Sequence, residues 1–143
     1  MQIELELKNI QDTINFAHQV ADLCKDNNFL IFLEGEIGVG KTTFAQALIK
    51  KLTNDEQVIL SPTYSFMNIY KHKYLIYHFD LYRLENETDI FELGFYEYLQ
   101  DKTAIRLVEW PKFINFIKPD IRIIFSNENN CRKVIIHNYL TTI

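Results

Sequence analysis

The sequence predicts a single α/β domain in which helices flank a mostly parallel β-sheet, and three observations support this prediction. Short apolar runs rich in β-branched and aromatic residues alternate along the chain with segments of helical periodicity. The chain has 143 residues, the size of one domain, and 48% of them are hydrophobic, which is enough to form a core. No repeat or glycine- and proline-rich linker divides the chain, so we expect one domain over residues 1–143.

The first part of the chain predicts a helix, a buried strand and a second helix. From Asn9 to Cys24, apolar residues recur at the spacing of an amphipathic helix. These residues are Ile10, Ile14, Ala17, Ala21 and Cys24. Residues 29–35, FLIFLEG, form a short apolar run that ends at a glycine, as a buried parallel strand does. Helix-forming residues follow from Lys41 to Leu52.

The second part of the chain predicts strands with one short helix between them. In order, the expected elements are a hairpin of residues 65–70 and 74–82, a short helix within 85–94 that ends at Gly94, a buried strand at 104–110, a turn or short helix opened by Pro111, and strands at 121–125 and 133–137. The two hairpin-like pairs indicate that antiparallel strands lie at the margin of the parallel sheet.

The charge and hydropathy of the chain exclude several classes of partner. Its net charge is −4 and its pI is near 5.5, which argues against strong nucleic-acid binding by this protein alone. No apolar run approaches the roughly 20 residues that a membrane span requires. The N-terminal segment MQIELELKN lacks the basic region and apolar core of a secretory signal. We therefore expect a cytoplasmic protein with no membrane partner.

A phosphate-binding loop is the strongest functional signal in the sequence. Residues 35–42, GEIGVGKT, match the pattern G-x-x-x-x-G-K-[ST] between a predicted strand and a predicted helix. Glycines let backbone N–H groups surround a phosphate, and the helix that follows begins with unpaired N–H donors. We expect Lys41 to reach the β- and γ-phosphates and the Thr42 hydroxyl to bind magnesium. The predicted nucleotide-binding residues are Gly35, Glu36, Ile37, Gly38, Val39, Gly40, Lys41, Thr42 and Thr43.

Two acidic residues follow apolar strands, and either can serve the nucleotide. Asp80 ends HFD and Glu109 ends LVE, so in a parallel sheet both can project at the carboxyl edge, where ligands bind. One can hold the metal while the other positions water, although each can also be a structural acid; their spacing does not assign the roles. His78 shares a side of its strand with Asp80, and a packed histidine is the preferred interpretation. Trp110 either reports nucleotide binding or packs in the core.

Other polar residues near the acids have open roles. Ser61 and Thr63 either belong to a loop that senses the γ-phosphate or make local turn hydrogen bonds. Tyr82 and Arg83 leave the strand beside Asp80. Arg83 can pair with Asp80, contact phosphate, meet a partner or form a plain surface ion pair.

The combination and order of the motifs resemble the bacterial TsaE family. The segments that carry the resemblance are GEIGVGKTTF, SPTYSF followed by Tyr70, HFDLYRL, ELGFYEYL and LVEW. They span about residues 30–112. Ile37 and Val39 stand where the family often has Leu and Ala, and neither contributes a functional side chain. The chain after Asn115 carries little family signal.

The resemblance implies an ATPase that supports formation of threonylcarbamoyladenosine in tRNA. It implies ATP bound at residues 35–42, with magnesium held by Thr42 and Glu109. It also implies that Asp80 is a catalytic or switch acid, acting with Lys41. The implied partner is the TsaB–TsaD heterodimer, in which TsaD transfers the threonylcarbamoyl group, so that tRNA is contacted only indirectly. Because no arginine lid is apparent, we expect slow hydrolysis alone and stimulation by the partner, bound partly through residues 61–83.

Three other functions compete with this interpretation. Small-molecule P-loop kinases usually bring several arginines in a lid, whereas the arginines here are scattered along the chain. GTPases normally carry an N-K-x-D-like segment that reads guanine, and none occurs in the sequence. A nucleotide-gated adaptor would differ from the ATPase only in lacking significant turnover.

Overall fold

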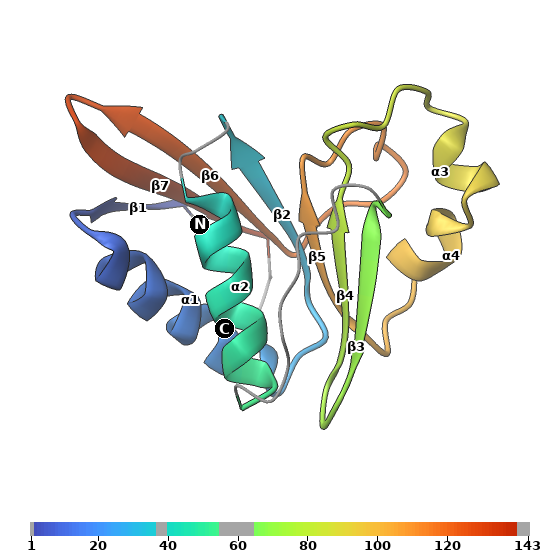
Figure 1. The fold of residues 1–143 in the computed structure, drawn as a ribbon, viewed down its shortest axis with the longest axis horizontal. Helices are drawn as coiled ribbons and strands as arrows, with labels where there is room; N and C mark the ends of the chain where they lie inside the picture. The colour runs from blue at the N-terminus through green and yellow to red at the C-terminus, as the bar shows by residue number, and fades with distance from the viewer. Residues whose placement is uncertain (1, 37–39, 55–64, 140–143) are drawn as a thin grey trace.

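The computed structural model describes residues 2–36, 40–54 and 65–139. It forms a seven-stranded mixed sheet with helices on both faces (Figure 1). The strand order is β1-β7-β6-β2-β5-β4-β3. Neighbours from β6 to β4 pair in parallel, whereas β1, β7 and β3 join by antiparallel pairing. The predicted fold class, an α/β domain with a parallel centre and antiparallel strands at its margin, is therefore confirmed.

The bounds of the elements agree with most of the predicted ranges. The strands are β1 Gln2–Leu7, β2 Leu30–Gly35, β3 Met67–Lys71, β4 Leu75–Asp80, β5 Ile105–Glu109, β6 Ile121–Glu128 and β7 Cys131–Asn138. The helices are α1 Ile10–Cys24, α2 Lys41–Leu52, α3 Asp89–Glu92 and α4 Phe95–Leu99. Within the described ranges, none of these helices has the length and apolar character needed to cross a membrane.

Two elements, β1 and α4, were not predicted from the sequence. Strand β1 alternates polar and apolar residues, which is a strand signal, but it lies at the sheet edge and only Leu7 is buried. Helix α4 follows Gly94, which adopts a left-handed φ of 78°. The glycine therefore separates two short helices, where the sequence predicts that it ends the only one.

Helix α1 begins where Asn9 caps it, and part of its predicted apolar stripe is buried. The Asn9 side chain accepts a hydrogen bond from the Asp12 N–H at 2.8 Å. Ile10, the first residue of the predicted apolar stripe, is 61% exposed; it lies in the first turn and lines a surface cavity. The buried residues of the helix are Thr13, Phe16, Ala17, Val20, Ala21 and Cys24.

The central strands supply two cores, one on each side of the sheet. Ile31 and Leu33 of β2 belong to the core covered by α1 and α2. Leu30 and Phe32 belong to the core on the other side, together with residues of α3 and α4. This alternation follows from the two-residue repeat of a strand. It means that every second side chain at the end of a central strand projects on the side of α2.

Candidate active site

The described ends of the phosphate loop have backbone geometry that favours glycine. Gly35 ends β2 with a φ of 129°, and Gly40 precedes α2 with a φ of 104°. A Cβ atom at Gly35 would also collide with the carbonyl oxygen of Phe125 on the neighbouring strand β6. Both glycines are therefore needed for the chain to turn from the strand into the helix. The predicted binding residues at positions 37–39 lie outside the described residues.

Lys41 is a buried cation at the start of α2. It is 4% exposed, and its Nζ donates a hydrogen bond to the Gly35 carbonyl. The same ammonium lies 3.4 Å from the centre of the Trp110 ring, within cation–π distance. Burial lowers the pKa of Lys41, and the negative charges of Glu109 and Asp80 oppose that shift. The lysine therefore interacts electrostatically with both predicted acids.

The next two predicted residues complete the first turn of α2. Thr42 is exposed and Thr43 is half-buried. The Phe44 N–H donates to the Gly40 carbonyl at 2.9 Å, which is the first backbone bond of the helix. The N–H groups before it have no partner within a helix, so they are donors for an anion. Glu36, at the other end of the loop, is exposed.

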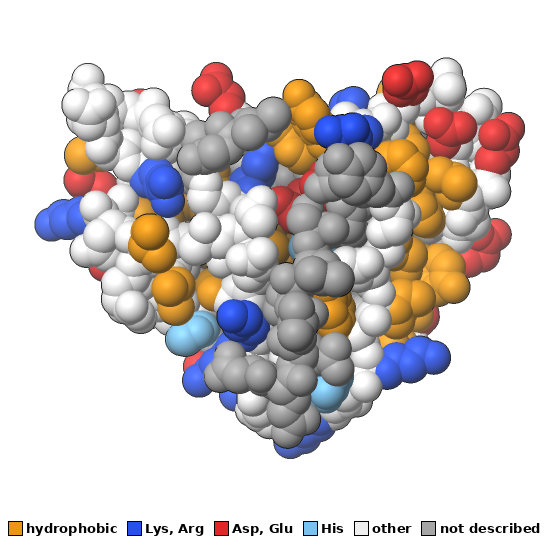
Figure 2. Space-filling view, viewed as in Figure 1, with side chains coloured by type: hydrophobic (Ala, Val, Ile, Leu, Met, Phe, Trp, Pro, Cys, Tyr) orange, Lys and Arg blue, Asp and Glu red, His pale blue; other side chains and the backbone are white. Residues whose placement is uncertain are grey.

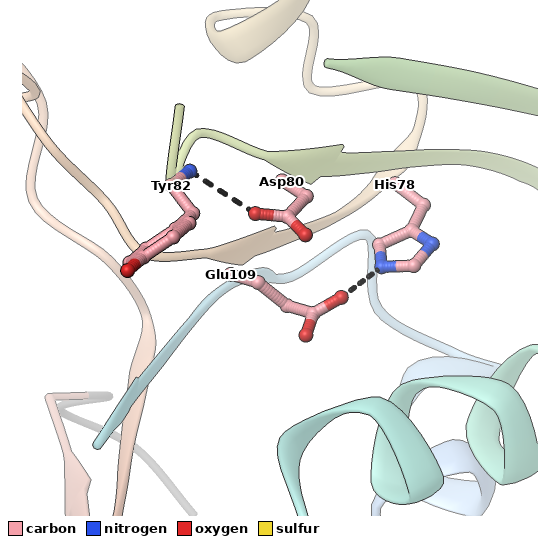
Figure 3. A network of polar contacts seen from close by, with 4 residues as sticks. All are labelled: His78, Asp80, Tyr82 and Glu109. Atoms are coloured by element: carbon pink, nitrogen blue, oxygen red, sulfur yellow. Dashed lines mark hydrogen bonds and ion pairs between the residues drawn. The ribbon is translucent and has the colours of Figure 1, made fainter. Parts of the chain in front are cut away.

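Asp80 and Glu109 lie side by side at the ends of β4 and β5. The two residues are direct partners in the parallel register. Ile76 and Ile105, at even spacing from them, lie in the core under α2, so both acids project on that side of the sheet (Figure 3). Glu109 is 3% exposed and Asp80 is half-buried. The strand ends thus bring the two acids and Lys41 to one edge of the sheet.

His78 holds Glu109 in place through a buried hydrogen bond. Its Nε2 lies 2.7 Å from Glu109 Oε2, and both side chains are almost fully buried (Figure 3). The other ring nitrogen, Nδ1, has no hydrogen-bond partner among the described residues. Packing was the preferred interpretation of His78, and the structure adds this polar role. Its position two residues before Asp80 predicted that both side chains share a side of β4. Nothing in the sequence of β4 identified its partner Glu109 on β5.

Asp80 has an environment different from that of Glu109. Its Oδ1 accepts a hydrogen bond from the Tyr82 N–H at 3.1 Å. Burial raises the pKa of Asp80 above the usual range for an aspartate, and Glu109 raises it further. The Tyr82 N–H, His78 and Lys41 oppose the rise without cancelling it. A carboxylate with a raised pKa accepts a proton more readily, which suits a general base.

The oxygen donors at this edge fit magnesium bound together with a phosphate ligand. Among residues 2–36, 40–54 and 65–139, no group of three or more His, Cys, Asp or Glu side chains can hold a metal ion by itself. Magnesium rarely needs such a group, because one or two carboxylates, substrate phosphates and water complete its shell. Glu109 and the exposed Thr42 hydroxyl therefore suit this ion, and its charge would offset the repulsion between Glu109 and Asp80.

Trp110, for which the sequence leaves open a core position or a place beside the nucleotide, lies against Lys41 in the structure. It is half-buried and adopts a left-handed φ of 55°, while its N–H donates to the Leu33 carbonyl at 3.1 Å. Its ring lies 4.8 Å from the Tyr82 ring, centre to centre. Trp110 also lines a cavity of about 390 Å³ next to the loop, with Glu34, Gly35, Glu36, Pro111 and Lys112. Strained backbone of this kind is often found at functional sites.

Three candidate residues remain: Arg83, Ser61 and Thr63. Arg83 has an exposed side chain beyond the end of β4. Ser61 and Thr63 lie outside the described residues, so the expected sensing loop has no structural account. The hairpin that follows them, β3 and β4, has the predicted antiparallel pairing.

Comparisons with known proteins agree with the motif pattern. A family model described as "Threonylcarbamoyl adenosine biosynthesis protein TsaE" matches residues 7–135. A tRNA threonylcarbamoyladenosine biosynthesis protein TsaE of Rickettsia bellii is 39% identical over 79% of this chain and 77% of its own length. The protein of that name in Rickettsia prowazekii is 34% identical over 87% of this chain and 90% of its own. The Bacillus subtilis protein is 32% identical over 85% and 75%, respectively.

Proposed function

Since this chain belongs to the TsaE family of threonylcarbamoyl adenosine biosynthesis proteins, we propose that it binds and hydrolyses Mg–ATP in support of threonylcarbamoyladenosine formation in tRNA. One observation carries the ATPase proposal: Lys41, Asp80 and Glu109 interact at one edge of the sheet, beside the first turn of α2. A buried lysine and two carboxylates next to a phosphate loop are the groups that phosphoryl transfer from a nucleotide requires.

Lys41 and the start of α2 bind the phosphates in this proposal. The Lys41 ammonium exchanges its hydrogen bond with the Gly35 carbonyl for the β- and γ-phosphate oxygens. Its partial desolvation strengthens the attraction, because water screens the charge less there. The free N–H groups of the first helical turn donate to the same phosphates.

Glu109 and Thr42 hold the magnesium ion, and Asp80 acts on the attacking water. When bound, magnesium would neutralise the charge that the phosphates carry. The His78 hydrogen bond fixes one oxygen of Glu109, so the other can face the ion. Asp80 orients a water molecule and accepts its proton as the oxygen attacks the γ-phosphorus. The bond from that phosphorus to the bridging oxygen breaks, and the products are ADP and inorganic phosphate.

The TsaB–TsaD heterodimer is the proposed partner, and the surface of the protein supports a protein contact. Ile69, in the middle of β3, and Tyr82, two residues after the end of β4, are each 42% exposed. Figure 2 shows hydrophobic side chains gathered over α3 and α4, bordered by acidic ones. Phe91 is 56% and Leu93 49% exposed there. Acidic side chains repel RNA phosphates, so this surface favours a protein and leaves tRNA to that partner.

Steady-state phosphate release, with and without the heterodimer, tests the proposed function. We expect slow release alone and an increase of ~10³ or more if the partner supplies or orders transition-state groups. Binding to the heterodimer, measured with ATP, with ADP and without nucleotide, is expected to depend on the nucleotide. Lys41→Ala serves as the inactive control in each arm.

The same assay separates the competing functions. Phosphate transfer to a small-molecule acceptor in place of water would identify a kinase. Nucleotide-dependent binding without release, even with the heterodimer present, would identify an adaptor. Fast release that is indifferent to the heterodimer would refute the partner while leaving the ATP site intact.

A further inference from the structure

A cavity with apolar and cationic lining residues lies on the side of the sheet away from α2. Its volume is about 440 Å³, within the range of small-molecule binding sites. It is formed by one residue each of β2 and β6 and by the segment that joins β5 to β6. The residues that line it are Phe32, Ile114, Asn115, Phe116, Ile117, Lys118, Pro119 and Arg122. None of them belongs to the cluster of Lys41, Asp80 and Glu109, so the cavity is separate from the reacting groups.

The apolar part of the lining is held in place by packing. Phe32 of β2 and Ile114 are buried, and both belong to the core on this side of the sheet. The ring of Phe116 lies 4.8 Å from the ring of Tyr96 in α4, centre to centre. Close packing of this kind fixes the position of side chains in a protein interior. A hydrocarbon group that enters the cavity would therefore contact a preformed apolar surface.

Arg122 lies beside Phe32 and has an incomplete ion pair. The two residues are direct partners in the parallel register, and the guanidinium carbon lies 5.8 Å from the centre of the Phe32 ring. Nε of Arg122 lies 3.3 Å from Oε2 of Glu34, yet neither of these buried atoms has a hydrogen-bond partner among the described residues. The ion pair therefore lacks a hydrogen bond. A carboxylate ligand that accepts from the guanidinium would supply one, often through two parallel N–H···O bonds.

Lys118 supplies the second cation of the lining. Its side chain is exposed, and its Nζ lies 4.4 Å from the centre of the Tyr139 ring. The lining itself contains no carboxylate, although the whole chain has a net charge of −4. Because Glu34 offsets the charge of Arg122, the lining and its ion-pair partner leave the positive charge of Lys118 uncompensated. A ligand with a single negative charge would balance it, whereas a phosphate monoester carries more than one at neutral pH.

We propose that this cavity binds a small monocarboxylate with an apolar body, of the chemical class of the medium-chain alkanoates. The carboxylate of the ligand pairs with Arg122 and Lys118. The hydrocarbon part lies against Phe32, Ile114 and Phe116, so both the charge and the apolar body are needed for binding. The site lies outside the phosphate loop and does not depend on the proposed function.

Titration with octanoate, followed by the amide chemical shifts of the protein, tests the site. We expect the largest shifts at residues 114–119 and 122. Acetate lacks the hydrocarbon and octylammonium carries the opposite charge, so each is expected to bind at least about tenfold more weakly than octanoate. Equal binding of octanoate and octylammonium overturns the proposal. Shifts confined to exposed apolar residues of α3, such as Phe91, also overturn it, because they would show binding to a different surface.

Two substitutions are expected to change the affinity for octanoate in opposite directions. Lys118→Gln removes a cation at an exposed position, and we expect the affinity to fall about fivefold. Glu34→Gln removes the carboxylate that competes for Arg122, and we expect the affinity to rise about threefold. Lys102→Gln is the matched control, since Lys102 is exposed and lies outside the lining. Loss of affinity in both variants, or a change in neither, contradicts the site.

Lys41→Ala separates this site from the phosphate loop. We expect octanoate to bind this variant as it binds the unaltered protein, because Lys41 is not part of the lining. If the variant loses octanoate, or if magnesium tripolyphosphate displaces it from the unaltered protein, the carboxylate occupies the phosphate loop and the proposed site is wrong. If octanoate does not bind while Lys41→Ala still weakens ATP binding, the monocarboxylate site is refuted and the proposed function stands.

Discussion

The two edges of the parallel sheet bury charged residues in opposite ways. At the amino edge, Arg106 is 3% exposed and donates to three backbone carbonyls: Ala104 at 3.2 Å, Leu99 at 2.6 Å and Asn28 at 3.1 Å. Nearby, the Asp120 carboxylate accepts the Leu30 N–H at 2.8 Å. These bonds tie the loops to the strands, so each buried polar group there is a structural link.

At the carboxyl edge, the polar groups are close together but incompletely satisfied. His78 Nδ1 has no hydrogen-bond partner among the described residues. The pKa of Asp80 is raised and that of Lys41 is lowered, in both cases chiefly by burial. At the amino edge the buried polar groups are hydrogen-bonded within the protein, which stabilises the fold. At the carboxyl edge they are left to interact with a charged ligand. Perturbed groups in such clusters are typical of functional sites.

Lys41→Ala gives the largest expected effect on activity and tests the functional edge. We expect ATP turnover to fall by about two orders of magnitude or more, because one transition-state charge contact is lost. The free energy of unfolding of the variant is expected to change little, since the Lys41 ammonium lies at the phosphate loop and not in the apolar core. Phosphate release and thermal unfolding measure the two quantities. A folded variant with unchanged turnover would contradict the role of Lys41.

Arg106→Met tests the amino edge, where we expect the opposite result: a loss of stability with little change in ATP affinity. Methionine can occupy the space of the arginine stem but leaves three carbonyls without their donor. We expect the free energy of unfolding to fall by about 2–3 kcal/mol. ATP affinity of the folded variant, measured at low temperature, is expected to stay within about twofold of the unaltered protein. A loss of affinity as large as the loss of stability would show that the two edges are not separable.

Substitution of the two acids sharpens the comparison within the carboxyl edge. Glu109→Ala is expected to raise the magnesium requirement and weaken nucleotide binding together, because Glu109 would hold the ion that neutralises the phosphates. Asp80→Ala is expected to keep more of the binding while losing turnover, because a general base acts after binding. Magnesium titrations at fixed ATP distinguish them. If only Asp80→Ala shifts the magnesium requirement, the two assignments are inverted.

The smallest expected effects are changes of stability with pH, and they have opposite signs at the two edges. Because the pKa of Asp80 is raised in the folded protein, its ionised form destabilises the fold, so Asp80→Asn is expected to stabilise the ligand-free protein near pH 7. At the amino edge, hydrogen bonds from Thr103 and Tyr77 lower the pKa of Asp101, so Asp101→Asn is expected to destabilise it.

The Asp80 difference is expected to shrink as the pH falls toward the ordinary aspartate pKa of about 4, whereas the Asp101 difference is expected to persist to that pH and shrink below it. Below that value Asp80 is protonated in the folded and unfolded states alike, while Asp101 loses its contribution as it becomes protonated through its lowered pKa. Each effect is at most about 1 kcal/mol, because solvent screens these partly exposed groups. Urea unfolding from pH 7 to about pH 3, with magnesium and nucleotide absent, measures both. Shifts of the same sign would contradict the contrast.

Most of the fold could be predicted because its signals are local. Strand β2, the loop and α2 follow from an apolar run, a glycine pattern and helix-forming residues in sequence. Strand β1 was missed although it alternates, since its place at the edge depends on pairing with β7 at the other end of the chain. Ile10 belongs to the predicted apolar stripe yet is exposed, because periodicity gives the stripe of a helix but not where the sheet beneath it ends.

The sequence by itself determined the glycine pattern of the phosphate loop and the positions of the two acids at strand ends, because these depend on spacing within single elements. Only the tertiary structure decided which acid His78 holds, since that bond joins residues 31 positions apart on neighbouring strands. It also decided that Trp110 lies under Lys41 and that Arg132 packs against Gly40. Such contacts depend on strand order and register, which are set by the packing of the whole chain and cannot be inferred from any single segment of the sequence.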